Sequence, residues 1–133
     1  MFLLTALLYV LLAIKHFLYD FPLQTHEEME YKGVFGDMRG AKHSVKHGFA
    51  TLVIFYLFIP LAAPTFFIID AVTHYLIDFS KVKLSKDLTP ADKKFWVLLG
   101  LDQLAHTLVY VSMIALYLYL RGRGVNSLWR MWH

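Results

Sequence analysis

Four pairs of histidine and aspartate residues, each with its members four positions apart, are the part of this sequence most suited to chemistry. The pairs are His16 and Asp20, His43 and His47, His74 and Asp78, and Asp102 and His106. On an α-helix, residues at i and i+4 lie on the same face, about 6 Å apart along the axis. Imidazole and carboxylate groups bind divalent metal ions, and the chain has no cysteine to supply a thiolate ligand. The pattern predicts a divalent metal site, with zinc as the first candidate and manganese, iron or nickel as alternatives.

Polar pairs on apolar helices also have a structural interpretation, because polar side chains hydrogen-bond between membrane helices and hold them together. The free-energy cost argues against this structural interpretation here, since inserting one ionisable group at the centre of a membrane helix costs about 2.5–3.5 kcal/mol. The eight side chains also exceed one tetrahedral ligand shell. Two arrangements stay open: a site with two metal ions, or a site in which some His–Asp couples orient the ligands.

Four further polar residues lie on or near the same helical faces: Gln24, Gln103, Lys81 and Asp70. The two amides could hydrogen-bond to metal ligands or to a substrate. Lys81 follows Asp78 and could neutralise it, meet an anionic substrate, or extend to the membrane surface as lysines at helix ends do. Asp70 lies deeper in its helix, toward the opposite end. We predict that these four residues contact the substrate or support the metal ligands.

The elements that must position these residues are long apolar segments. Hydrophobic residues make up 58% of the 133 positions and the mean hydropathy is +0.50, whereas a soluble domain is usually about 45–50% apolar. Four segments are long enough to cross a bilayer core of about 30 Å. They lie at about 1–24, 43–62, 65–83 and 90–120. The sequence predicts an all-α fold, an integral membrane four-helix antiparallel bundle that forms a single transmembrane domain over residues 1–133. All four pairs then lie at similar depth, near the loops 25–42 and 84–90.

Basic residues are distributed unevenly between the two ends of this bundle. Ten of the thirteen lie at the end with the loops 25–42 and 84–90: Lys15, Lys32, Arg39, Lys42, Lys46, Lys81, Lys83, Lys86, Lys93 and Lys94. Arg121, Arg123 and Arg130 lie at the other end. Because positive residues favour the cytoplasmic side, we expect both termini outside and the site facing the cytoplasm. The basic residues adjoin apolar segments, so we expect a lipid bilayer as partner and no nucleic acid. Homo-oligomerisation stays open.

The polar residues also form motifs in a fixed order. These are His16-x-x-x-Asp20-Phe21-x-x-Gln24 with Lys32, His43 with His47, His74-x-x-Ile77-Asp78-x-x-Lys81, and Asp102-Gln103-x-x-His106. Together they resemble the family of small bacterial and phage integral membrane proteins known as domain of unknown function 3307. The resemblance implies a metal-binding protein of unassigned activity, in a bacterial inner membrane or the membrane of a phage-infected cell. A looser similarity to bacterial inner-membrane metal-dependent hydrolases implies no residue roles. The long insert between Gln24 and His43 departs from the family pattern and could change access to the site.

Three classes of function fit these residues. A metal-dependent hydrolase acting on a membrane-associated, lipid-linked substrate would use the metal to lower the pKa of bound water to about 7. Metal or proton transport would use intramembrane histidines and aspartates as stepping stones, although the far half of the bundle offers only Asp70 and a few hydroxyls. A structural metalloprotein or interaction module would use the metal to hold the helices together. We take the hydrolase as the working hypothesis, and the sequence identifies no catalytic residue.

Overall fold

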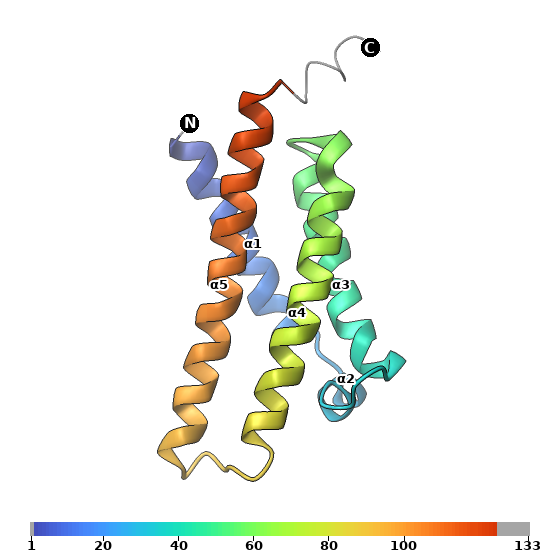
Figure 1. The fold of residues 1–133 in the computed structure, drawn as a ribbon, viewed down its shortest axis with the longest axis vertical. Helices are drawn as coiled ribbons and strands as arrows, with labels where there is room; N and C mark the ends of the chain where they lie inside the picture. The colour runs from blue at the N-terminus through green and yellow to red at the C-terminus, as the bar shows by residue number, and fades with distance from the viewer. Residues whose placement is uncertain (1, 125–133) are drawn as a thin grey trace.

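Over the residues that the structure describes, the chain folds into four long α-helices and one short one. The computed structural model describes residues 2–124, and no β-strand occurs in that range. The helices are α1 (Phe2–Asp20), α2 (His26–Tyr31), α3 (Met38–Tyr56), α4 (Ala63–Ser85) and α5 (Lys93–Gly122), and a 3-10 turn at Pro60–Ala62 joins α3 to α4. Successive long helices run in opposite directions, and the short α2 lies beside the beginning of α3, near the level where α1 ends (Figure 1). The all-α fold predicted from the sequence is confirmed.

Capping residues explain why two helices differ from the predicted segments. α1 ends at Asp20 rather than near residue 24. Thr25 then begins α2 with a capping box, in which its hydroxyl accepts from the backbone N–H of Glu28 and the carboxylate of Glu28 accepts from the backbone N–H of Thr25. α3 begins at Met38 rather than at residue 43, because the carboxylate of Asp37 caps its first turn.

The start of α5 also lies later than the predicted residue 90. The carboxylate of Asp92 accepts hydrogen bonds from the backbone N–H and the hydroxyl of Thr89, at 2.8 and 2.9 Å. These bonds close a turn ahead of the helix, so Asp92 takes the N-cap position and α5 begins at Lys93. The same two bonds hold the pKa of Asp92 below its ordinary value.

Among the described residues, three helical stretches are long and apolar enough to cross a membrane. They are Phe2–Asp20, Pro60–Ser85 and Lys93–Gly122, and an 18-residue segment within each has a mean hydropathy of 1.9, 1.3 and 1.5, respectively. α3 is not one of them, because basic residues and histidines fill its first half. Large apolar side chains cover the outside of the long helices, and Phe17, Val53 and Leu108 are each more than half exposed. Such a surface suits contact with lipid.

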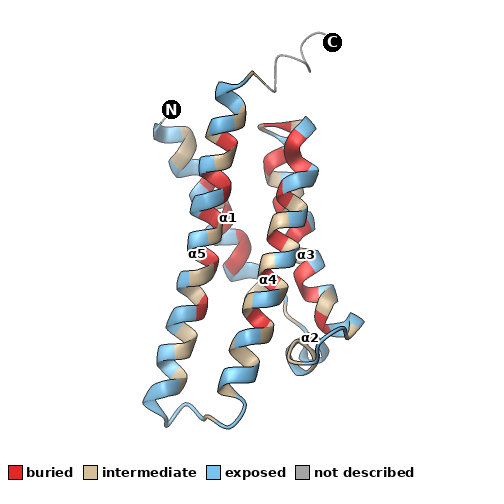
Figure 2. Ribbon diagram, viewed as in Figure 1, coloured by how far each residue is buried: buried red, intermediate tan, exposed pale blue. Residues whose placement is uncertain are grey.

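The buried side chains divide along the helices into an apolar half and a polar half. The inward faces are buried and the outward faces are exposed (Figure 2). The apolar core lies toward the start of α1 and the end of α5, and it includes Leu8, Leu12, Phe55, Ile59, Phe66, Met113 and Tyr117. Phe55 and Phe66 stack there with their ring centroids 3.8 Å apart. The buried polar residues lie toward the other end, which we call the α2 end.

α3 and α4 approach one another closely at Gly48. A Cβ atom at this position would lie 2.9 Å from the carbonyl oxygen of Phe67 and 3.0 Å from Cβ of Ala71. We therefore expect Gly48→Ala to push the helices apart and to lower the free energy of unfolding by about 1–3 kcal/mol, measured by thermal unfolding in detergent. Gly100→Ala is the matched control, because nothing lies within 4 Å of a Cβ there and alanine favours the helix. Equal stability of the two variants would contradict close packing at Gly48.

Candidate metal centre

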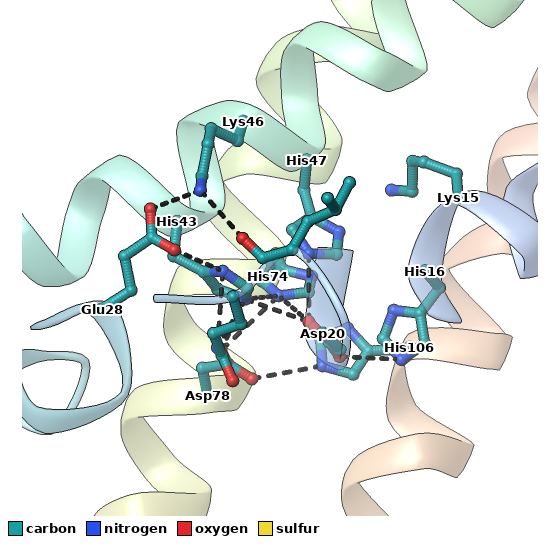
Figure 3. Close-up of polar contacts among 12 residues, drawn as sticks. Lys15, His16, Asp20, Glu28, His43, Lys46, His47, His74, Asp78 and His106 are labelled. Atoms are coloured by element: carbon teal, nitrogen blue, oxygen red, sulfur yellow. Dashed lines mark hydrogen bonds and ion pairs between the residues drawn. The ribbon is translucent and has the colours of Figure 1, made fainter. Parts of the chain in front are cut away.

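The eight predicted ligands come from all four long helices and meet in one cluster. Figure 3 labels all of them except Asp102. They are His16 and Asp20 of α1, His43 and His47 of α3, His74 and Asp78 of α4, and Asp102 and His106 of α5, and we call them the His–Asp cluster. Seven of them are buried, and the side chain of Asp20 is only 9% exposed. The i,i+4 spacing therefore turns both members of each pair toward the same interior.

Asp20 lies among four histidines. Its Oδ1 lies 3.0 Å from Nε2 of His43 and 3.0 Å from Nε2 of His47. The same oxygen lies 3.4 Å from Nε2 of His74, while Oδ2 lies 3.0 Å from Nε2 of His16. The carboxylate of Asp20 thus contacts imidazoles from α1, α3 and α4.

Asp78 forms a second junction in the cluster. Its Oδ2 lies 3.5 Å from Nε2 of His43 and 3.5 Å from Nε2 of His74. Its Oδ1 lies 3.5 Å from Nε2 of His106, and that nitrogen lies 3.7 Å from Oδ1 of Asp102. The two oxygens of Asp78 face different histidines, so this residue links α5 to the rest of the cluster.

Overlapping groups within the cluster could hold a metal ion. They are His16, Asp20, His47 and His74; His43, His74 and Asp78; and Asp78, Asp102 and His106. In each group, one donor atom per residue lies within 4.8 Å of the others. The Nε2 atoms of His43 and His74 are 3.1 Å apart, close to the separation of about 3.3 Å between ligands of a tetrahedral zinc ion with Zn–N bonds of about 2.0 Å. His74 and Asp78 each belong to two groups, so the groups share ligands.

Several donor atoms of the cluster contact one another without hydrogen bonding. Nε2 of His47 lies 3.0 Å from Oδ1 of Asp20, yet it has no hydrogen-bond partner of acceptable geometry among the described residues. Nε2 of His106 and Oδ1 of Asp102 are also buried without a hydrogen-bond partner among the described residues. Unpaired buried polar atoms are costly. Ligands of one metal ion do show this arrangement, because their lone pairs point at the ion rather than at one another.

Comparison with protein families adds a second line of evidence. The chain matches the family described as protein of unknown function (DUF3307) over residues 7–131. It belongs to the DUF3307 family. The match covers the whole His–Asp cluster and confirms the resemblance seen in the motifs. Comparisons with curated proteins and with solved structures found no match. Because the function of DUF3307 proteins is unknown, the role of the cluster has to follow from its geometry.

In this DUF3307 chain, the two predicted glutamines each lie against a cluster histidine. Oε1 of Gln103 lies 3.2 Å from Nε2 of His16. When the amide of Gln24 is oriented so that both of its ends are satisfied, its oxygen accepts from Nε2 of His43 and from Nζ of Lys32, both at 3.2 Å. Both glutamines are therefore placed to orient an imidazole or to contact a molecule bound beside it.

The other two predicted residues lie on different sides of the cluster. Lys81 lines a groove between α4 and α5 together with Asp102. Asp70 lies deeper, where its Oδ2 accepts from Nζ of Lys15 and from the hydroxyl of Thr51, both at 2.6 Å. Lys15, counted from the sequence among the basic residues at the α2 end of the bundle, does not lie at the surface, because its side chain is only 3% exposed. Asp70 neutralises Lys15 in the interior, which allows the lysine to point inward.

Sequence reasoning missed the contacts that cover the cluster at the α2 end. Glu28 is 1% exposed and binds Nζ of Lys46 at 2.6 Å, and Lys32 binds Oδ2 of Asp78 at 3.2 Å. Burial raises the pKa of Glu28, but hydrogen bonds from Lys46 and Thr25 outweigh this effect and the pKa lies below its ordinary value. Their spacing of four residues would allow Glu28 and Lys32 to pair with one another, and only the tertiary structure shows that Glu28 binds α3 and Lys32 binds α4.

Proposed function

We propose that this protein is a metal-dependent hydrolase that is embedded in the membrane and acts on a membrane-associated substrate. The observation that carries the proposal is the surplus of ligands, since eight His and Asp side chains gather in overlapping groups. A closed structural site needs only four ligands. A surplus allows an ion to keep a position for water, whose pKa the metal lowers to about 7. It also leaves carboxylates that can act as general base.

The sharing of ligands supports two metal ions. Asp78 presents one oxygen to His74 and the other to His106, as a carboxylate between two ions would. Ions in two-metal hydrolytic sites lie about 3.5–4 Å apart, a spacing that one carboxylate can bridge. We assign one ion to His16, Asp20, His47 and His74 and the other to Asp78, Asp102 and His106, with His43 beside both. Zinc is the first candidate, and manganese, iron and nickel accept the same donors.

We further propose that all four long helices cross the bilayer, as an integral membrane antiparallel bundle that forms a single transmembrane domain. Support comes from the length and hydropathy of α1, α4 and α5. α3 packs closely against α4 at Gly48, so it would share their membrane position. Its histidines would not prevent insertion once they hold a metal ion, because coordination replaces the water they lose.

The distribution of charge supports an orientation in a bacterial inner membrane or the membrane of a phage-infected cell. Even without Lys15, the α2 end carries most of the exposed basic side chains: Arg39, Lys42, Lys83, Lys86, Lys93 and Lys94, against Arg121 and Arg123 at the other end. Arg130 lies outside the described residues. By the positive-inside rule, the cluster faces the cytoplasm and both termini lie outside. We expect a C-terminal fusion to a phosphatase that folds only outside the cytoplasm to be active. Activity of a strictly cytoplasmic reporter at that position would contradict this orientation.

Transport and a structural role are the alternatives. A transport path would need polar groups beyond the Lys15–Asp70 pair, but the described residues there include Leu8, Phe55 and Phe66, all at 0% exposure. A structural metalloprotein or interaction module is better supported, because His43 and His74 are also fully buried. It is therefore the second candidate.

Metal analysis and activity assays on the full-length protein in lipid nanodiscs test the proposal. We expect elemental analysis to find about two divalent ions per chain, as a two-metal site requires. A chelator should abolish hydrolysis of lipid phosphoesters or amides, and reloading with zinc should restore it. Tightly bound metal with every coordination position filled by protein, and no hydrolysis of either class of substrate, would favour the structural role instead.

A further inference from the structure

We propose that the substrate is a membrane lipid with a phosphate head group, which reaches the His–Asp cluster sideways from the bilayer through a cleft between α1 and α5. This inference rests on the proposed hydrolase function and names its substrate class. The cleft has a volume of about 230 Å³. Its lining residues are Tyr9, Ala13, His16 and Phe17 of α1, Phe21 directly after α1, and Gln103, His106, Thr107 and Tyr110 of α5. It therefore ends at two of the cluster histidines.

The walls of the cleft change from apolar at the outside to polar at the inside. Phe17, on the outward face of α1, and Phe21, directly after the end of α1, are both 58% exposed, and their rings stack with centroids 5.6 Å apart. His16 and His106, at the inner end, are 8% and 2% exposed. Acyl chains would contact the outer rings, while a polar head group would meet the histidines. The cleft thus fits a molecule that is apolar at one end and polar at the other.

The inner part of the cleft suits an anionic head group. The hydroxyl of Tyr110 lies 3.0 Å from Nδ1 of His16, and Oε1 of Gln103 lies 3.2 Å from its Nε2. Tyr110, Gln103 and Thr107 are uncharged, and no carboxylate is among the residues that line the cleft. A phosphate would therefore meet uncharged side chains along the cleft, and the carboxylates behind His16 and His106 would be neutralised by the metal ions of the proposed site.

The charge of the metal-loaded cluster also favours a phosphate over a neutral amide. Three carboxylates, those of Asp20, Asp78 and Asp102, stand against two divalent ions in the proposed site. Lys32 adds a further positive charge beside Asp78, whereas Lys15 is neutralised by Asp70. The surplus is positive, and it would attract an anion in an environment of low dielectric constant.

The α2 end of the cluster is covered, which makes entry from the water phase less favourable. Glu28 is buried against Lys46, and Lys32 reaches over to Asp78. Gly40 at the start of α3 packs so tightly on this segment that a Cβ there would lie 2.8 Å from Cα of Lys32. The long insert between the first two apolar segments thus acts as a cover, and the lateral cleft is the route that we assign to the substrate.

Photo-crosslinking tests this route without requiring turnover. The probe is phosphatidic acid with a diazirine near the carbonyl end of one acyl chain, added to zinc-loaded protein in phosphatidylcholine nanodiscs. We expect cross-links at the lining of the cleft, including Phe17 and Thr107, and loss of this labelling in Ala13→Trp, which fills the cleft. Ala115→Trp is the matched control, because this alanine is exposed on α5 and is not among the residues that line the cleft. Metal content, measured in both variants, should equal that of the wild type and shows that the fold is intact.

Competition distinguishes a lipid from a water-soluble phosphate. Unlabelled phosphatidic acid should displace the probe, and glycerol 3-phosphate at the same concentration should not. Equal labelling of Ala13→Trp and Ala115→Trp, or equal displacement by the two competitors, would overturn the lateral route. Labelling of the cleft without any hydrolysis would refute the hydrolase and retain the lipid site. Hydrolysis of a soluble phosphoester that Ala13→Trp leaves unchanged would retain the hydrolase and refute the route.

Discussion

His74→Ala is expected to remove most of the metal from the purified protein. Nε2 of His74 lies 3.4 Å from Oδ1 of Asp20 and 3.5 Å from Oδ2 of Asp78, so this imidazole belongs to two of the candidate ligand groups. Loss of a residue that only orients a ligand lowers metal affinity by about 10–100-fold. Loss of a direct ligand should lower it further. We therefore expect a decrease of more than about 100-fold, measured by competition with a chelating dye.

His26→Ala is the matched control for this experiment. His26 is exposed at the start of α2 and belongs to none of the ligand groups, so its removal should leave affinity and stoichiometry unchanged. Because metal binding is coupled to folding, added zinc should raise the midpoint of thermal unfolding in His26→Ala and not in His74→Ala. Identical metal content in the two variants would exclude His74 as a ligand.

The meeting of the four pairs could be predicted because two simple rules act together. Spacing of four residues places both members of a pair, such as His74 and Asp78, on one face of a helix. Helices that alternate in direction then bring pairs that adjoin the same loops to the same level, as with His16 and Asp20. Neither rule depends on details of packing, and the structure places all eight side chains in one cluster.

The direction of single charged side chains could not be predicted in the same way. Lys15 is next to His16 in the sequence, and its partner Asp70 lies on a different helix. Because a hydropathy pattern does not show a partner on another helix, it predicts that Lys15 lies at the surface. The cover at the α2 end depends on the buried ion pair of Glu28 with Lys46, which joins α2 to α3. Contacts of this kind follow from the packing of helices against one another, which local patterns do not encode.

The buried pair of Lys15 and Asp70 is the second place where one substitution should have a large effect. Their side chains are 3% and 1% exposed, and Nζ lies 2.6 Å from Oδ2. Thr51 donates a further hydrogen bond to the same oxygen at 2.6 Å, and Nζ lies 4.8 Å from the ring centroid of Tyr110. The pair thus joins α1, α3 and α4 on the side of the cluster that faces the apolar core, and each charge depends on the other because water is excluded.

Lys15→Met should lower the free energy of unfolding by about 3–5 kcal/mol, because it leaves the carboxylate of Asp70 buried without a counter-charge. The double variant Lys15→Met with Asp70→Leu should recover most of this loss, since an apolar pair of similar volume replaces a buried ion pair at little net cost. Lys42→Met is the control, because Lys42 is exposed on α3 and its loss should have little effect on stability. Unfolding by denaturant in detergent micelles, at matched metal content, measures all three variants. If the double variant is no more stable than Lys15→Met, then the lysine stabilises the protein through its own packing, and the charge of Asp70 is not the reason for the loss.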